Sequence, residues 1–366
     1  MIRNWLRLVI EYSKLKMEKC NQLYNKSKDY LFVVNHCLWI VVFILLCSCE
    51  NKYQYIPKNI EQINVNIFRF DSAQLAVRTD SAYSDICKLY ANYQEFMPMF
   101  VEGILGVPSE DTTYFSQLYV EFLTDTTIGV AQTNTLAKDK FANIDNLQQS
   151  FNTAFSRLHY LYPTWEIPTI YLFVSGFNSS VMYYDNMIGV GIDMYLGSDY
   201  SLYNQVVYEY QKQTMRKECI PVDVLKMYLA YHIAYNGKTN RLLDQLIFRG
   251  KLLFLLSHLL PNEPKWEIIG YTQDQWNWCK TYERAIWNRI MEKRDLFKTE
   301  STILSSYLNE GPFTAEITQE SPGRLGQWVG WQIIDSYMRN NEDVTIQDLI
   351  NESDAQKILE NSFYKP

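Results

Sequence analysis

The chain has 366 residues, and its 34 Lys or Arg against 41 Asp or Glu give a formal net charge of −7 at pH 7. Seven of the basic and three of the acidic residues precede Cys49, so the rest of the chain carries 27 against 38, a net charge of −11. This acidic balance argues against a nucleic-acid-binding protein, and the 47% of hydrophobic residues excludes a disordered chain.

The first feature along the chain is an apolar run over 38–46 that leads into a Leu-x-Ser-Cys sequence ending at Cys49. Basic residues upstream, a short apolar run and small residues before a cysteine are typical of a bacterial lipoprotein signal. A membrane anchor is the alternative, but the 16 residues of 31–46 fall short of the roughly 20 that a spanning helix needs. We therefore predict a signal peptide over 1–48, a lipid on Cys49 and a tether over 49–60.

The first part of the body is predicted to be mainly helical. Residues 63–70 alternate in a period of two, which predicts a strand. Apolar residues then recur at helical spacing over 81–105, where Pro98 interrupts, and again over 111–124 and 144–161.

The pattern changes between 167 and 196, where three short apolar runs rich in β-formers are separated by turn residues. We expect these runs to form a small antiparallel meander of three strands. Helical parts over 71–165 and 200–366 would flank it, giving a mostly helical α+β fold in one domain over 61–366. In the second helical part, the predicted helices are 222–236, 240–260, 272–293, 300–308, 324–340, 345–349 and 353–361.

Glu283 is a candidate for a site because it shares a helix face with Trp276 and Trp287. A carboxylate among tryptophans should be paired or have a raised pKa, and Arg249 and Arg324 are the cations expected to pair with it. A structural ion pair is the simpler interpretation, and an acid in a cleft is the alternative.

The remaining features have structural interpretations. Gly326 and Gly330 lie four residues apart on a helix with polar residues, so we expect close packing against another helix within a soluble body. We expect His258 to be a hydrogen-bonded helix residue and Ser175 to be a turn residue, because no G-x-S-x-G motif surrounds it. Cys87, Cys219 and Cys279 are expected to be buried thiols with at most one disulfide.

Several segments from residue 171 onward match a known family. They are Tyr171-Leu-Phe-Val-Ser-Gly-Phe-Asn178, Gly189-Val-Gly-Ile-Asp-Met-Tyr-Leu-Gly197, Gln245-Leu-Ile-Phe-Arg-Gly-Lys-Leu-Leu253, Gly311-Pro-Phe-Thr314 and Ser321-Pro-Gly-Arg-Leu-Gly-Gln-Trp-Val-Gly-Trp-Gln332. These segments resemble the gliding motility lipoprotein GldB family. The resemblance implies an envelope lipoprotein associated with gliding machinery and its companion secretion system, and it implies no established catalytic activity.

That family is more distantly similar to predicted zinc peptidases with a helical H-E-x-x-H motif, in which two His bind zinc and Glu activates water. At the comparable place this chain has Tyr228, Leu229 and His232, and Arg249 stands where a third ligand would be. The resemblance therefore implies a degenerate zincin-like domain with no metal, no cofactor and no catalytic residue.

Together these observations predict a non-catalytic binding or assembly component, anchored in a lipid membrane through Cys49. Its partners would be other envelope proteins of the motility or secretion machinery, and we expect it at the outer membrane facing the periplasm. A peptide-binding cleft is expected between the small sheet and the helix 222–236. The alternatives are an envelope hydrolase or peptidase-like enzyme with an atypical site around His232 and Glu283, and a solute-binding lipoprotein.

Overall fold

The structure is a computed structural model, and the predicted signal peptide, Cys49 and the first part of the tether lie outside the residues it describes. Tyr55–Pro366 form one compact unit. Within the described residues, no helix is both long and apolar enough to cross a bilayer. The described residues are 11, 16, 55–107, 112–124 and 129–366.

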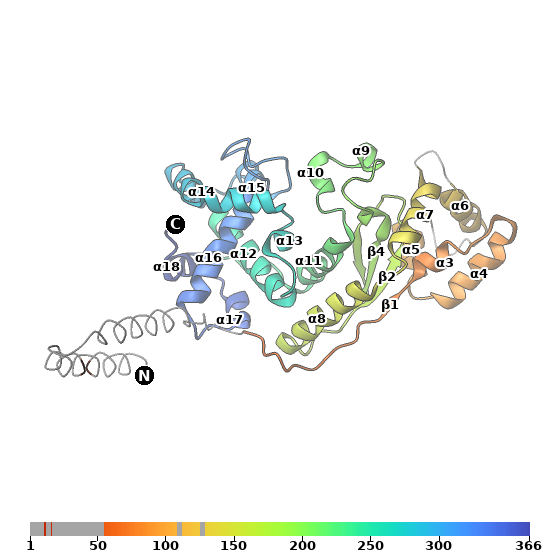
Figure 1. The fold of residues 1–366 in the computed structure, drawn as a ribbon, viewed down its shortest axis with the longest axis horizontal. Coiled ribbons are helices and arrows are strands. Elements are labelled where there is room, and N and C mark those ends of the chain that lie inside the picture. Colours follow the sequence, from red (N-terminus) through yellow and green to blue (C-terminus); the bar gives the residue numbers. More distant parts are fainter. Residues whose placement is uncertain (1–10, 12–15, 17–54, 108–111, 125–128) are drawn as a thin grey trace, which may run out of the picture. The chain divides into compact units, whose positions relative to one another are not determined.

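The unit is a mostly helical α+β fold, as predicted (Figure 1). The elements before the central strands are β1 (Ile67–Phe68), α3 (Phe70–Gln74), α4 (Ala82–Asn92), α5 (Met97–Gly103), α6 (Thr112–Thr124), α7 (Val130–Lys140) and α8 (Asp145–Leu161). The central strands are β2 (Thr169–Phe173), β3 (Val181–Tyr184) and β4 (Met187–Gly191). The helices that follow are α9 (Tyr203–Val206), α10 (Glu209–Lys212), α11 (Ile220–His232), α12 (Leu242–Leu259), α13 (Lys265–Ile269), α14 (Gln273–Glu292), α15 (Ser301–Leu308), α16 (Leu325–Asn340), α17 (Ile346–Asn351) and α18 (Ala355–Ser362).

The sheet differs from the predicted antiparallel meander. Its order is β1-β2-β4-β3, with β4 parallel to β2 and only β3 antiparallel to β4. Burial explains the difference, because every residue of β4 is buried, which suits a central strand, whereas Tyr184 of β3 is exposed, which suits an edge. The turn between β3 and β4 is as expected, since Asp185 and Asn186 both have positive φ.

The predicted strand over 63–70 is wrong for most of its length. Only β1 pairs with β2, because the preceding backbone binds side chains of α8 instead of a neighbouring strand. The amide of Ile63 donates to Ser156 Oγ at 2.7 Å, and the amide of Val65 donates to Asn152 Oδ1 at 2.9 Å. Helix α3 begins immediately after β1, at Phe70.

The sheet separates two hydrophobic cores, as the alternation of side chains along a strand requires. Ile170 and Leu172 of β2 belong to the larger core, which also contains residues of α8, α11, α12 and α16. Tyr171 and Phe173 belong to the smaller core, in which Phe96 stacks on Tyr171 with ring centroids 4.4 Å apart.

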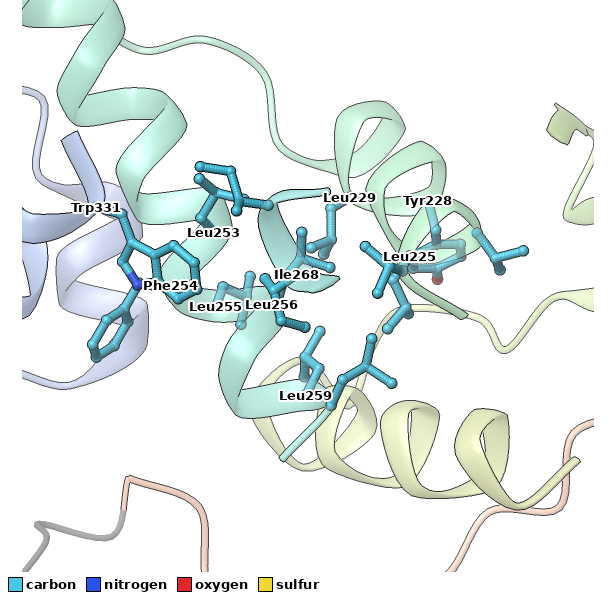
Figure 2. Close-up of a cluster of buried hydrophobic side chains, with 14 of the residues drawn as sticks. Leu225, Tyr228, Leu229, Leu253, Phe254, Leu255, Leu256, Leu259, Ile268 and Trp331 are labelled. Atoms are coloured by element: carbon cyan, nitrogen blue, oxygen red, sulfur yellow. The ribbon is translucent and has the colours of Figure 1, made fainter. Parts of the chain in front are cut away.

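Helix α12 lies at the centre of the larger core. Figure 2 shows its leucines between Trp331 of α16 and the leucines of α11. The crossing of α12 and α16 brings backbone against backbone: a Cβ added to Gly330 would lie 1.9 Å from the carbonyl oxygen of Leu246, and one added to Gly250 would lie 2.4 Å from the carbonyl of Gly330. The predicted close packing at Gly326 and Gly330 is therefore confirmed.

Replacing Gly330 with alanine is predicted to lower the free energy of unfolding by about 3 kcal/mol, because the two helix backbones must move apart. Alanine has the better helix propensity by about 1 kcal/mol, so any loss reflects the contact and not the helix itself. The measurement is urea unfolding, with Gly311→Ala as the control, since the nearest atom to its added Cβ would be 3.5 Å away. Equal stabilities of the two variants would contradict the described crossing.

Candidate functional site

A cavity of about 620 Å³ lies between α11, α12, the segment after β4 and the start of α16, and we call it the α11 cavity. It occupies the place where a cleft was expected between the small sheet and the helix that begins near 222. Its wall is largely apolar, with charged side chains at several points. The charged residues that line it are Asp223, Lys226, Arg249, Glu310 and Arg324.

Helix α11 presents one face to this cavity. Pro221 stands in its first turn, where the missing N–H is not needed by the helix. Asp223, Lys226, Met227 and Ala230 line the cavity, and their spacing of three, four and seven residues places them on one side of the helix. The sequence therefore places two charged side chains, a methionine and an alanine on the cavity side of α11, while most other apolar positions of the helix pack into the core.

Asp223 is held on the wall of the cavity by a tyrosine. The Tyr195 hydroxyl donates to Asp223 Oδ2 at 3.0 Å, and Lys226 Nζ lies 4.0 Å from Asp223 Oδ1, too far for a hydrogen bond. The side chains of Asp223 and Lys226 are 30% and 32% exposed, so both are only partly in contact with water. Desolvation raises the pKa of Asp223 and lowers the pKa of Lys226. The opposite charge of the neighbouring side chain acts against both shifts but is the smaller cause.

Arg324 and Glu310 form a second charged pair at the cavity. Arg324 Nη1 lies 3.0 Å from Glu310 Oε1, and Nη2 donates to the carbonyl of Gly270 at 2.9 Å. Arg324 precedes α16 with a positive φ of 58°, and the conformation fixes its side chain beside the ring of Tyr271. Arg249, on α12, is exposed and makes no hydrogen bond or ion pair within the described part of the chain.

The three residues aligned with the H-E-x-x-H motif do not form one site. Tyr228 is fully buried, and its hydroxyl donates to the carbonyl of Glu166 at 2.6 Å. His232 Nδ1 lies 2.9 Å from the carbonyl oxygen of Tyr228, and its ring stacks on that of Tyr228 with centroids 4.1 Å apart. Of the three, only Leu229 lines the cavity, so Tyr228 and His232 lie on another face of α11.

The donor set does not fit a zinc ion. The residues that face the α11 cavity at a spacing of four are Asp223 with Met227 and Lys226 with Ala230, and neither pair supplies two zinc ligands. Arg249 also lines the cavity, and its cation would repel a metal ion. No cluster of three or more His, Cys, Asp or Glu able to hold a metal occurs within the described residues.

The predicted pairing of Glu283 with Arg249 or Arg324 is wrong. Glu283 accepts a hydrogen bond from the Tyr364 hydroxyl at 2.9 Å, while Arg324 binds Glu310. The reason is that Glu283 faces the end of the chain and does not line the α11 cavity. Burial is the main reason that the pKa of the Tyr364 hydroxyl is raised, and the negative charge of Glu283 raises it further.

The remaining candidates have structural roles. Ser175 donates to Asp193 Oδ2 at 3.0 Å, and the same carboxylate accepts the amides of Ser175 and Phe177, which fixes the turn after β2. His258 Nδ1 lies 2.8 Å from the carbonyl oxygen of Phe254, as expected for a helix residue. Cys219 and Cys279 are buried free thiols, whereas Cys87 is exposed, contrary to expectation.

Sequence reasoning missed Asp223, Lys226 and Tyr195 as site residues. A signal was present, because Asp223 and Lys226 are a charged pair three residues apart within an otherwise apolar helix. Tyr195 carried no such signal, since its role depends on the short turn after β4 that brings it to α11.

The pH dependence of stability tests the environment of Asp223. Because its pKa is raised in the folded chain, the folded state loses stability as this carboxyl ionises with rising pH, from its unfolded pKa of about 4 upward. Asn carries no charge and can still accept the Tyr195 hydroxyl. The unfolding free energy of Asp223→Asn relative to the native chain is therefore predicted to increase between about pH 4 and pH 7.

This difference would be measured by urea unfolding across that pH range. Asp343→Asn, at an exposed position in the loop after α16, is the control. A difference for Asp223→Asn that stays flat or falls with rising pH would contradict the desolvated carboxyl.

Comparison with known proteins identifies the chain's family. The family model described as gliding motility protein GldB matches residues 50–366, which includes the sheet, α11, α12 and the whole α11 cavity. The label of that model marks a lipoprotein family, in line with an envelope location. No curated protein and no solved structure matches the chain. The match extends over most of the chain, so this protein belongs to the GldB family of gliding motility proteins.

Proposed function

We propose that this chain is a lipid-anchored, non-catalytic binding component of the envelope machinery for gliding motility and protein secretion, and that it works through the α11 cavity. The observation that carries the proposal is the cavity itself. It is large enough for an amino-acid-sized group, it is lined by apolar and charged side chains, and it lies within the segment that matches the GldB family.

The residue types in the cavity favour binding over hydrolysis. Lys226, Ala230 and Arg249 are not a set that activates water, and Asp223 already accepts the Tyr195 hydroxyl. The rival hydrolase would use His232 and Glu283 in one site. His232 lies on α11 beside Tyr228, while Glu283 on α14 binds Tyr364, and neither lines the cavity.

Anchoring by a lipid fits the charge of the body. The chain after residue 48 has a net charge of −11, so an anionic membrane surface would repel it. A lipid on Cys49 would hold the body near the membrane against that repulsion, and we place it at the outer membrane facing the periplasm. Partners would then be envelope proteins of the same machinery.

Neutralising Lys226 or Arg249 in the cavity is predicted to reduce gliding several-fold without changing the amount of protein. Lys226→Met and Arg249→Gln each keep most of the side-chain volume and remove a positive charge. Lys280→Gln and Arg339→Gln, at exposed positions of α14 and α16 outside the cavity, are the matched controls. The measurement is colony spreading after complementation of a deletion strain, with immunoblotting for protein level.

Normal spreading of both cavity variants would contradict a working role for the cavity. Equal loss in the control variants would indicate a general effect of surface charge. Stoichiometric zinc in the purified native protein would favour the hydrolase.

Replacing Cys49 with alanine is predicted to abolish incorporation of a fatty-acid probe and to release the body from the membrane fraction. The lipid is attached to this thiol in the proposal, so its loss removes the proposed anchor. The measurement is metabolic labelling followed by fractionation, with Cys87→Ala as the control because Cys87 is an exposed thiol on the body. Equal labelling of the native chain and Cys49→Ala would contradict the anchor.

A further inference from the structure

We propose that the α11 cavity takes a carboxyl-terminal residue of a partner polypeptide, with the carboxylate at Lys226 and Arg249 and the apolar side chain against the methionines and leucines of the wall. This inference rests on the proposed function and names the chemical class of its ligand. It is carried by the unequal pairing of charges in the cavity.

The two anionic side chains of the cavity are already engaged. Asp223 accepts the Tyr195 hydroxyl at 3.0 Å, and Glu310 lies 3.0 Å from Arg324. Arg324 is also engaged, because it donates to the carbonyl of Gly270 as well. The charge of Arg324 is therefore balanced by Glu310 within the protein, which makes Arg324 a weaker attraction for a ligand carboxylate than a cation without such a partner.

Two cations remain available. Lys226 Nζ is 4.0 Å from its nearest carboxylate oxygen, so its N–H donors are not used by that group. Arg249 makes no hydrogen bond or ion pair within the described residues and lies on the wall formed by α12. A partly desolvated ammonium and a free guanidinium facing one cavity would stabilise a carboxylate, which can accept hydrogen bonds from both.

The rest of the wall indicates what the carboxylate is attached to. Met194, Met215 and Met227 line the cavity together with Leu252 and Leu256. Methionine side chains are unbranched and adapt to different apolar shapes, so this wall suits an apolar side chain without fixing its identity.

A peptide fits the cavity better than an acyl chain because polar groups are interspersed among the apolar ones. Ser180, Gln211, Thr214 and Asn309 lie on different parts of the wall. Gln211 Oε1 accepts the amide of Tyr208 and Thr214 Oγ1 donates to the carbonyl of Gln211, but the amide group of Gln211 and the hydroxyl oxygen of Thr214 can still bind backbone amides, which an acyl chain lacks.

The test uses the native chain in lipid nanodiscs and three probes measured by isothermal titration calorimetry. The probes are acetyl-Ala-Ala-Leu with a free carboxylate, the same peptide as its carboxyl-terminal amide, and hexanoate. We expect the acid to bind at least ten-fold more tightly than the amide, a difference of about 1.4 kcal/mol. Hexanoate should bind more weakly than the peptide acid.

Variants locate the carboxylate. Lys226→Met and Arg249→Gln should each weaken binding of the peptide acid at least ten-fold, Lys226→Arg should retain it, and Arg339→Gln should leave it unchanged. Melting curves of each variant establish that the chain is folded.

Three results would overturn the inference: equal affinity for acid and amide, no binding of the acid, or tight binding of hexanoate with none of the peptide. Each of them leaves the proposed function standing if the cavity variants still lose gliding. Normal gliding of those variants would instead remove the proposed function, whatever the peptides do.

Discussion

The contact of two helix backbones at Gly250 and Gly330 is the constraint on which the rest of the structure depends. No side chain separates α12 from α16 at this point, so the residues next to the contact have little freedom of position. Arg249 directly precedes Gly250, and Arg324 precedes the first turn of α16. The crossing that completes the core therefore also places two of the cations of the α11 cavity.

The cavity has a different charge character from the body around it. The body is strongly acidic, yet within the described residues Arg249 has no ion pair, and Lys226 lies 4.0 Å from Asp223 without donating a hydrogen bond to it. An acidic surface lowers non-specific attraction of other anions, while a few cations in a partly desolvated cavity provide a local attraction with defined geometry. This combination favours a specific ligand over general adhesion, and it is consistent with a component of an assembly.

Sequence patterns predicted the parts of the fold that depend on local periodicity, and they failed where distant segments decide. The predicted helices after the sheet correspond to α11, α12 and α14 to α18 because their apolar spacing and caps lie within each segment, whereas the short helices α9, α10 and α13 were not predicted. The strand order could not be predicted from local periodicity. It depends on the position of β4 between β2 and β3, where other parts of the chain bury every residue of β4. The strand over 63–70 failed for a related reason, because side chains of α8 take the hydrogen bonds that a neighbouring strand would have taken.

The position of the cavity and three of its lining residues, Leu229, Arg249 and Arg324, were predicted from the sequence, but Asp223 and Lys226 were not. A cavity lies beside the helix after the sheet, where the cleft was expected. Comparison with the zinc motif singled out Tyr228 and His232, but these two residues lie on a face of α11 that does not line the cavity. A helix of 13 residues has several faces, and the motif's spacing alone does not say which one meets the cavity.

The central claim is that gliding requires an open α11 cavity. Ala230 is an exposed residue of α11 that lines the cavity, so Ala230→Trp would obstruct the cavity without replacing a core residue. Ala285→Trp, at an exposed position of α14 outside the cavity, is the matched control. The account predicts that Ala230→Trp keeps the melting temperature of the native chain and loses surface movement, while Ala285→Trp keeps both. Normal movement with a folded Ala230→Trp protein would contradict the account.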